Sequence, residues 1–229
     1  MAELHIVFAL FPGVTQLDFT GPHQVFSRLP GAKVTAASMG GADIAADGLV
    51  FAGLADLKAI VRCDLLCVPG GFGTTEAMLD EAFVAEIRRL GSGAQYVTSV
   101  CTGSLILAAA GFLRGKRAAC HWAWRDLLLP FGAIVDEGRV ARDGNIITGG
   151  GVTAGIDFAL VVAAELAGDA VAQGIQLGLE YAPAPPFDSG RPETAPPEVL
   201  ESYQRAMARL QEPRRAGALA AAHRLEGAQ

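Results

Sequence analysis

The chain has 229 residues, of which 51% are hydrophobic and 18% charged, and its formal net charge at pH 7 is −6. This apolar content provides ample material for a buried core and excludes intrinsic disorder. The net negative charge argues against nucleic acid as the main partner, because duplex binding usually needs a basic stripe. Four cysteines and four histidines occur at spacings that match neither a disulfide framework nor a zinc site.

Short apolar runs alternate with helical patterns along the chain. Predicted strands cover residues 5–10, 33–38, 48–53, 64–68 and 95–100, and residues 139–148 have the pattern of a hairpin about Asp143-Gly144. Predicted helices cover residues 18–29, 82–90, 104–112, 121–129, 152–166 and a segment that ends near residue 181. Continuously apolar strands separated by helices predict a mostly parallel sheet with helices on both faces.

The domain organisation follows from the absence of a linker in this alternating region. We expect one domain over residues 1–229, with a helical tail from about residue 196. Residues 182–187 form a proline-rich segment that we expect to be extended. The pattern of residues 196–225 is that of a charged amphipathic helix or helix pair, which either packs on the domain or crosses to a second subunit.

The first apolar run and the lengths of the other apolar runs predict the cellular location. The first apolar run is short and follows no Lys or Arg, so it is read as a strand and not as a signal peptide. The longest apolar stretches, such as residues 158–167, are too short to span a bilayer. We therefore expect a cytoplasmic protein without membrane association.

Cys101 is the strongest candidate for a functional residue. A β-rich run ends at Cys101, and Thr102-Gly103-Ser104 then opens a helix. Such a turn projects its first side chain clear of the sheet, as in nucleophile elbows built on serine. The unpaired N–H groups of the helix N-terminus favour a thiolate, so we expect a pKa below the value of roughly 8.5 for a free thiol. The alternative is a buried structural cysteine, and Gly103 favours function because it removes bulk beside the sulfur.

Two further segments follow strands and would lie at the same edge of the sheet. Gly70-Gly71 can aim backbone N–H groups at developing negative charge, or can be an ordinary turn. Asp18 follows the first strand at the start of a helix. It is either a carboxylate that caps the helix or one that is hydrogen-bonded to the Cys101 sulfur and shuttles a proton.

Other motifs carry weaker signals. The glycines of residues 148–155 lack the spacing of a dinucleotide fingerprint and are explained by helix–sheet packing, so no cofactor is expected. His121 does not adjoin the nucleophile, since Thr102 follows Cys101. We interpret His121 as a residue of a helix start or as a supporting group, while a direct chemical role stays open. The remaining cysteines, Cys63, Cys67 and Cys120, occur in strand-like contexts and are assigned to the core.

Five segments taken together resemble the ThiJ/PfpI superfamily, and the resemblance spans roughly residues 4–180. They are Val68-Pro-Gly-Gly71, Ser99-Val-Cys-Thr-Gly-Ser104, Ala110-Gly-Phe-Leu-Arg-Gly115, His121-Trp122 and Thr148-Gly-Gly-Gly-Val-Thr-Ala-Gly-Ile-Asp157. The resemblance implies an α/β fold of the flavodoxin-like sandwich type, in which a reactive cysteine occupies a nucleophile elbow.

Two segments extend beyond the superfamily pattern and resemble the bacterial isocyanide hydratases: Leu17-Asp-Phe-Thr-Gly-Pro22 and Glu180-Tyr-Ala-Pro-Ala-Pro-Pro-Phe187. This resemblance implies hydration of an isocyanide to an N-substituted formamide by a homodimer without a cofactor. The nucleophile of that group corresponds to Cys101, its partner carboxyl to Asp18, and its backbone amides beside the thiolate to Gly71 and Thr102. Cys120 stands where threonine is expected, outside the motifs.

The expected chemistry is covalent. We hypothesise that Cys101 attacks the isocyanide carbon while Asp18 supplies a proton, and that water then attacks the resulting thioimidate with Asp18 as base. The scarcity of basic residues near the motifs suits a neutral substrate. Two alternatives stay open: a glyoxalase- or deglycase-like enzyme that uses the same cysteine on dicarbonyls, and a non-enzymatic redox or ligand sensor built on Cys101.

Overall fold

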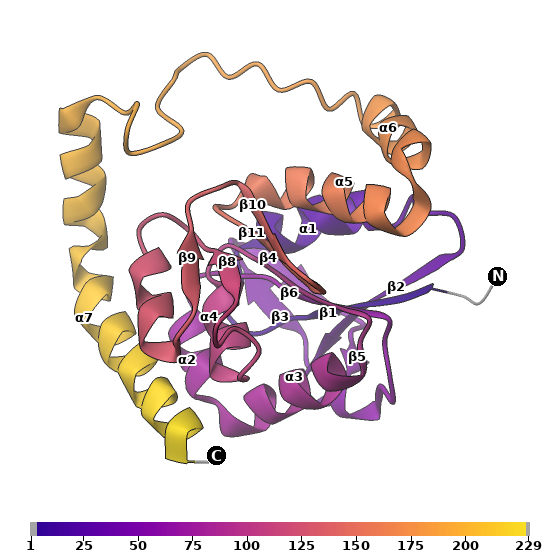
Figure 1. The fold of residues 1–229 in the computed structure, drawn as a ribbon, viewed down its shortest axis with the longest axis horizontal. Helices are drawn as coiled ribbons and strands as arrows, with labels where there is room; N and C mark the ends of the chain where they lie inside the picture. The colour runs from indigo at the N-terminus through magenta and orange to yellow at the C-terminus, as the bar shows by residue number, and fades with distance from the viewer. Residues whose placement is uncertain (1–3, 228–229) are drawn as a thin grey trace.

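The computed structural model describes residues 4–227. Its centre is a seven-stranded sheet in the order β10-β11-β7-β6-β1-β2-β5, in which every pairing is parallel except that of β10 with β11. Two small two-stranded sheets, β3-β4 and β8-β9, flank it (Figure 1). The strands are β1 Leu4–Ala9, β2 Ala32–Ser38, β3 Ile44–Ala46, β4 Leu49–Phe51, β5 Ala55–Asp56, β6 Leu65–Val68, β7 Tyr96–Val100, β8 Arg117–Ala119, β9 Ile134–Asp136, β10 Val140–Asp143 and β11 Ile146–Gly149.

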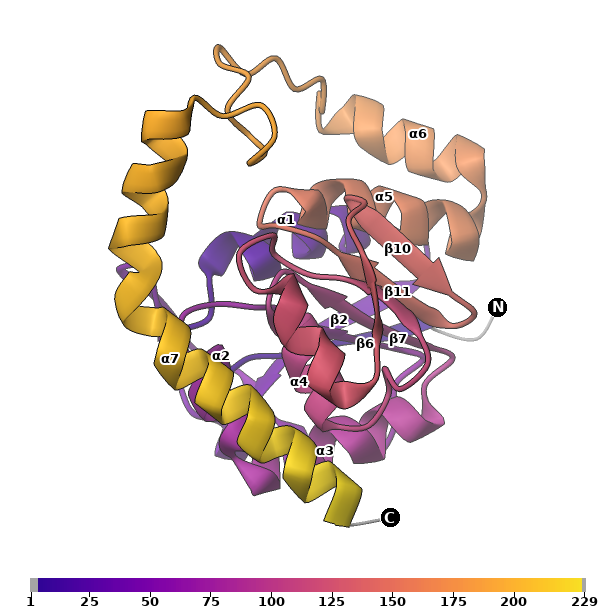
Figure 2. The same ribbon diagram turned by 60° about the vertical axis from the view of Figure 1, so that its left-hand side comes forward.

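Helices cover both faces of this sheet (Figures 1 and 2). On one face, Phe26 of α1 packs against Phe158 of α5 with ring centroids 6.1 Å apart. On the other face, Phe83 of α3 packs 5.8 Å from Phe11, which follows β1. The predicted mostly parallel sheet between two helical layers is confirmed. The helices are α1 Gln16–Phe26, α2 Thr74–Leu79, α3 Glu81–Gly93, α4 Gly103–Ala109, α5 Ala154–Ala167, α6 Asp169–Gly178 and α7 Pro197–Gly227.

The apolar runs form strands because the central ones are buried on both faces. β6 and β7 consist entirely of buried residues, and β1 is buried over its last four. Such strands need continuous apolar sequence, since neither face meets water. The hairpin expected over residues 139–148 is also present, with β10 antiparallel to β11.

Two of the departures from the predicted elements have a clear physical cause. Residues 121–129 were predicted to be an α-helix, and this is wrong: turns lead into a 3₁₀ helix over Arg125–Phe131. Pro130 lies within this segment and cannot donate the backbone hydrogen bond that an α-helix needs, and Gly132 ends it in the left-handed conformation. The strand predicted over residues 48–53 is one arm of the small β3-β4 hairpin, which turns at Asp47-Gly48 with positive φ at both residues.

The C-terminal region forms one helix, α7, and not a pair. It packs against α2, α4 and the 3₁₀ helix, so segments far apart in sequence lie side by side (Figure 2). Its buried residues recur at helical spacing and are mostly small: Arg214, Gly217, Ala218, Ala221, Ala222 and Leu225. No helix among residues 4–227 has the length and apolar character needed to cross a membrane.

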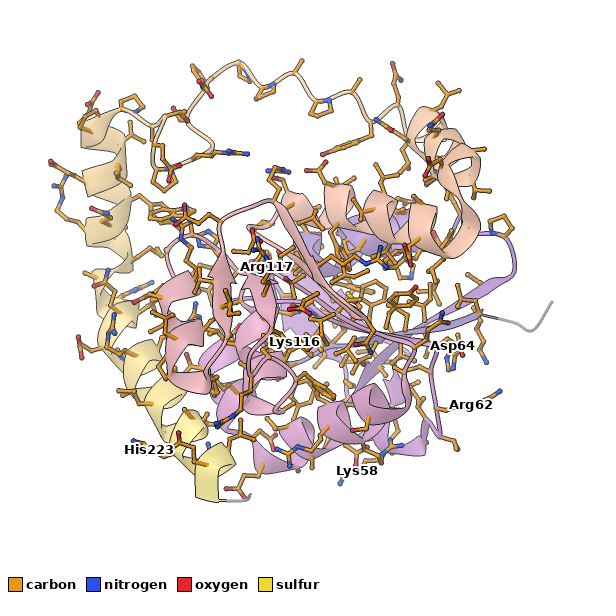
Figure 3. The ribbon with its side chains drawn as sticks, viewed as in Figure 1. Lys58, Arg62, Asp64, Lys116, Arg117 and His223 are labelled. Carbon is orange, nitrogen blue, oxygen red and sulfur yellow. The ribbon has the colours of Figure 1, made fainter. Side chains whose placement is uncertain are left out.

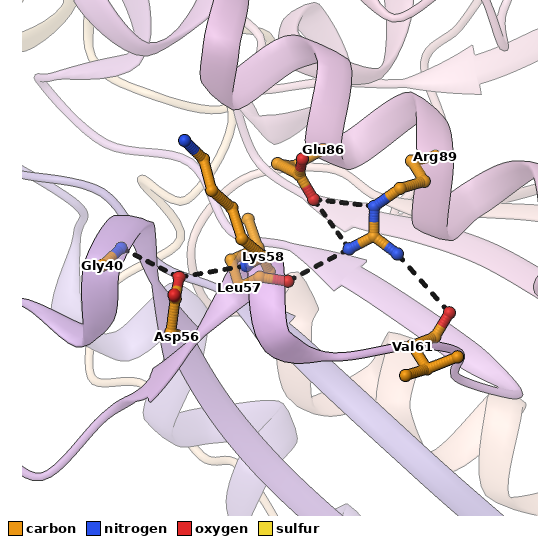
Figure 4. A network of polar contacts seen from close by, with 7 residues as sticks. All are labelled: Gly40, Asp56, Leu57, Lys58, Val61, Glu86 and Arg89. Carbon is orange, nitrogen blue, oxygen red and sulfur yellow. Dashed lines mark hydrogen bonds and ion pairs between the residues drawn. The ribbon is translucent and has the colours of Figure 1, made fainter.

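Charged side chains lie mainly at the periphery (Figure 3). Arg62 and Asp64 precede β6 and therefore mark the amino ends of the parallel strands, the edge opposite Cys101. There, Arg89 of α3 donates to the carbonyl oxygens of Leu57 (3.2 Å) and Val61 (3.4 Å), and it pairs with Glu86 (Figure 4). These contacts hold the connection between β5 and β6 and leave the opposite edge free for a site.

Candidate active site

Cys101 lies at a strained turn between β7 and α4. Its φ is +60°, a left-handed conformation that is uncommon for a residue other than glycine. Its N–H donates to the carbonyl oxygen of Gly149 (3.0 Å), which extends the pairing of β7 with β11 up to the turn. At Gly103 a Cβ would overlap the carbonyl oxygen of Val68, so only glycine lets α4 start this close to the end of β6. The elbow expected from residues 95–104 is present.

Asp18 is brought to this turn from the start of α1. Its side chain is fully buried, and Oδ2 accepts a hydrogen bond from the N–H of Gly70 (3.0 Å). The carboxyl therefore does not cap its own helix; Thr15 occupies the N-cap position. Oδ1 has no hydrogen-bond partner among residues 4–227, and interaction of the carboxyl with the Cys101 side chain lowers the pKa of Asp18. Of the two interpretations of Asp18, the helix cap is excluded, and the proton shuttle stays a prediction.

The two groups strongly affect each other's protonation. Burial raises the pKa of Asp18 to about 7, although hydrogen bonding to Cys101 and to the Gly70 N–H partly opposes the rise. Burial also raises the pKa of the Cys101 thiol well above its ordinary value, and the negative charge of Asp18 raises it further. The N–H of Thr102 hydrogen-bonds to the sulfur and lowers this pKa, but it does not outweigh the burial.

The expectation that the Cys101 pKa falls below roughly 8.5 is therefore wrong. The physical reason is that α4 is short and offers one amide to the sulfur, which lowers the thiol pKa only partly. Burial and the adjacent carboxyl both disfavour the thiolate and raise the pKa by more. The thiol consequently needs a base near neutral pH. A carboxyl with a pKa of about 7 in contact with it is such a base.

Gly71 and Thr102 lie in one buried hydrogen-bond network. The N–H of Gly71 donates to Oγ1 of Thr102 (3.0 Å), and Oγ1 of Thr74 donates to the carbonyl oxygen of Gly71 (2.8 Å). The two threonine hydroxyls are 2.7 Å apart. Either hydroxyl can be the donor between them, and Oγ1 of Thr102 also lies 3.4 Å from the carbonyl oxygen of Gly71. The backbone N–H of Thr102 thus faces the sulfur, while the Gly71 amide acts on the Thr102 side chain.

His121 is held in its neutral form. Burial, together with the positive charge of Arg214, lowers its pKa to about 4. Its Nδ1 accepts the N–H of Ala123 (3.2 Å), so the proton resides on Nε2. Its ring stacks on that of Trp122 with centroids 5.7 Å apart. These contacts fit the supporting role considered for this residue.

A cavity of about 530 Å³ opens beside His121. Cys120, His121 and Trp122 line it, together with residues 150–153 and 190–194. Cys120 lines this cavity, and its negative charge, when ionised, raises the pKa of Cys101. Cys63, Cys67 and Cys120 are all buried, and burial raises the pKa of each thiol to about 12. Among residues 4–227, no group of three or more His, Cys, Asp or Glu side chains could hold a metal ion.

Sequence reasoning gave α7 no part in the site, yet two of its side chains reach it. Tyr203 packs on Trp122 with ring centroids 5.4 Å apart. Arg214 is buried and donates to the carbonyl oxygens of Gly71 (3.1 Å) and Phe72 (3.0 Å). The signal was present in the sequence, since Arg214 falls in register with the small residues that form the buried stripe of the helix.

Comparison with known proteins decides the family. The model of the DJ-1/PfpI family matches residues 4–165. The chain belongs to the DJ-1/PfpI family. It is 50% identical over 206 residues to the isonitrile hydratase of Pseudomonas putida, which covers 90% of each chain. It is 30% identical to protein dj-1beta of Drosophila melanogaster over 74% of this chain and 93% of that protein.

A solved structure of a THiJ/PfpI family protein from Pseudomonas syringae superposes with a TM-score of 0.92. The two chains are 41% identical, and the match covers 95% of this chain and 91% of that one. The family and the flavodoxin-like α/β sandwich expected from the motifs are thereby confirmed.

Proposed function

We propose that this member of the DJ-1/PfpI family hydrates isocyanides to N-substituted formamides, with Cys101 as nucleophile and Asp18 as proton shuttle. The observation that carries the proposal is the buried carboxyl of Asp18 beside the thiol at the elbow. The similarity to an isonitrile hydratase along 90% of both chains supports the choice of substrate. An uncharged, rod-shaped isocyanide also suits a nucleophile that is only 5% exposed.

The first step forms a bond between sulfur and carbon. Asp18 as carboxylate takes the thiol proton of Cys101, and the thiolate attacks the terminal carbon of the isocyanide. The electron pair left on that carbon takes the proton back from Asp18. The product is a thioimidate, R–N=CH–S–Cys101, beside an ionised Asp18. The N–H of Thr102 stabilises the thiolate as it forms.

The second step releases the formamide. Asp18 takes a proton from water while the water oxygen attacks the thioimidate carbon, and the imine nitrogen receives that proton. The tetrahedral intermediate R–NH–CH(OH)–S–Cys101 then gives its hydroxyl proton to Asp18, the carbonyl forms and the carbon–sulfur bond breaks. The products are R–NH–CHO, the Cys101 thiolate and protonated Asp18. Transfer of the proton from Asp18 to the thiolate restores the starting pair.

The test is product formation from an aryl isocyanide by wild type, Cys101→Ala and Asp18→Ala. Formamide should be formed by wild type, abolished in Cys101→Ala, and slowed about 10²-fold or more in Asp18→Ala, as for a lost general acid–base. The exposed Asp43 supplies a matched control, and Asp43→Ala should keep full activity. Near-normal turnover by Asp18→Ala would remove its role.

The same assay separates the alternatives. Turnover of a dicarbonyl and none of an isocyanide by folded wild type would favour the deglycase-like activity, and turnover of neither would leave a sensor thiol. The expected homodimer and cytoplasmic location stay predictions, and the mass of the purified protein in solution tests the first.

A further inference from the structure

Arg214 is a buried cation without a carboxylate partner. Arg214 lies on α7 and is 3% exposed, and its guanidinium lies 4.5 Å from the centroid of the Trp124 ring. Among residues 4–227 no Asp or Glu oxygen comes within 4.0 Å of it. Burying an unpaired charge is costly, so its retention calls for a role beyond packing.

The guanidinium donates to one short turn. Nη2 donates to the carbonyl oxygens of Gly71 (3.1 Å) and Phe72 (3.0 Å), and Nε donates to Oγ1 of Thr75 (3.3 Å). The same turn directs its N–H groups to the site: that of Gly70 to Asp18 and that of Gly71 to Thr102. Arg214 therefore binds the carbonyl oxygens of this turn, while the N–H groups of the same turn bind Asp18 and Thr102.

The groups whose charges interact with that of Cys101 come from three parts of the fold. Asp18 is on α1, Cys120 follows β8, and Tyr203 and Arg214 are on α7. Arg214 is the one cation in this set, and His121 beside it is held neutral. Glu76 of α2 acts on Arg214 from beyond ion-pair distance, and Asp126 acts on Cys120. Burial lowers the pKa of Arg214, but a guanidinium stays charged in proteins.

We propose that Arg214 is a positioning residue: its guanidinium fixes the Gly70–Phe72 turn against Asp18 and Thr102, and its charge offsets that of the Cys101 thiolate. The inference rests on the proposed function for its effect on turnover, but its effect on the thiol is independent of any substrate. Arg214 touches neither the sulfur nor the Asp18 carboxyl through a hydrogen bond, so it acts through the turn and through its field.

The experiment compares Arg214→Gln, Arg214→Lys and the control Arg215→Gln. Arg215 is the next residue, but it is exposed and pairs with Asp126 at 2.8 Å. The first readout is the ultraviolet absorbance of the Cys101 thiolate against pH, taken as the difference from the same protein with Cys101→Ala. The second is kcat and KM for an aryl isocyanide. Folding of each variant is checked by circular dichroism.

Arg214→Gln should move the thiolate titration up by about one pH unit or more, because an opposite charge is lost near a buried acid. Arg214→Lys should restore most of that titration, since it keeps the charge. It should still lower kcat about tenfold with KM nearly unchanged, since one ammonium nitrogen cannot replace both Nη2, which donates to the two carbonyls, and Nε, which donates to Thr75. Arg215→Gln should match wild type in both readouts.

A folded Arg214→Gln with the wild-type titration overturns the proposal. If Arg214→Gln does not fold, Arg214→Lys provides the test. A wild-type kcat in Arg214→Lys would contradict the role of the guanidinium geometry. A tenfold lower kcat together with a wild-type titration would support it. Absence of isocyanide turnover in wild type would refute the proposed function, while the titration of the Arg214 variants would still test the charge.

Discussion

Replacing Asp18 by Asn should make the protein more stable while making it inactive. The asparagine side chain is close in shape to that of aspartate and could still accept the N–H of Gly70, but it carries no charge to be desolvated. Asp18 is fully buried, and its pKa rises from 3.8 to about 7 chiefly because burial penalises the carboxylate. The folded state therefore binds this proton more tightly than the unfolded state does.

The sign and the size follow from proton linkage. Below about pH 4 both states hold the proton, so Asp18 costs nothing; as pH rises from about 4 to about 7, only the folded state holds it, and stability falls. At about 1.4 kcal/mol for each pH unit, a pKa rise from 3.8 to about 7 amounts to about 4 kcal/mol, lost in full above pH 7. Asp18→Asn should recover a large part of this free energy at about pH 8 and little at about pH 4.

Urea unfolding of wild type, Asp18→Asn and the exposed control Asp43→Asn across this pH range measures the difference. The account predicts a gain in stability for Asp18→Asn that grows with pH, and no such trend for Asp43→Asn. A variant that is no more stable than wild type at about pH 8, or a gain that is the same at every pH, would refute the assignment of a desolvated carboxyl at Asp18.

Three further outcomes are expected. The kcat/KM for an isocyanide should fall about tenfold for each pH unit below about 7, because protonated Asp18 cannot take the thiol proton; a flat profile across this range would contradict the shuttle. Gly103→Ala, whose Cβ would overlap the Val68 carbonyl, should lower both turnover and the melting temperature, whereas Gly93→Ala, which has open space, should change neither much. Thr102→Val should cost about 1–3 kcal/mol in urea unfolding, since it leaves the buried N–H of Gly71 without its acceptor; wild-type stability would argue that another acceptor replaces it.

Much of the sheet could be predicted because the evidence is local. Strands buried on both faces require continuous apolar sequence, and the runs of β1, β6 and β7 have it. The elbow could also be predicted, because Cys101 directly follows a strand-like run and Gly103 comes two residues later. The 3₁₀ helix over Arg125–Phe131 could not be predicted from apolar spacing, since its apolar residues also suit an α-helix and only Pro130 argues against one.

The electrostatics of the site could not be obtained from local patterns. The rule that a helix N-terminus lowers a thiol pKa considers the amides next to Cys101 and omits burial, which depends on the whole fold. Asp18 accepts a hydrogen bond from Gly70, 52 residues away, and Arg214 donates one to Gly71, 143 residues away. Helical periodicity places Arg214 on the buried stripe of α7, but it does not say what that stripe covers.

The central claim is that the Cys101 sulfur bonds to the isocyanide carbon during hydration. The most direct test mixes wild type and Cys101→Ala with an aryl isocyanide, quenches the reaction in acid during turnover, and measures both formamide and the mass of the protein. The account predicts that wild type forms formamide and carries an adduct of the substrate's full mass on the peptide that contains Cys101, and that folded Cys101→Ala does neither. Formamide formed at a near wild-type rate by folded Cys101→Ala would contradict it.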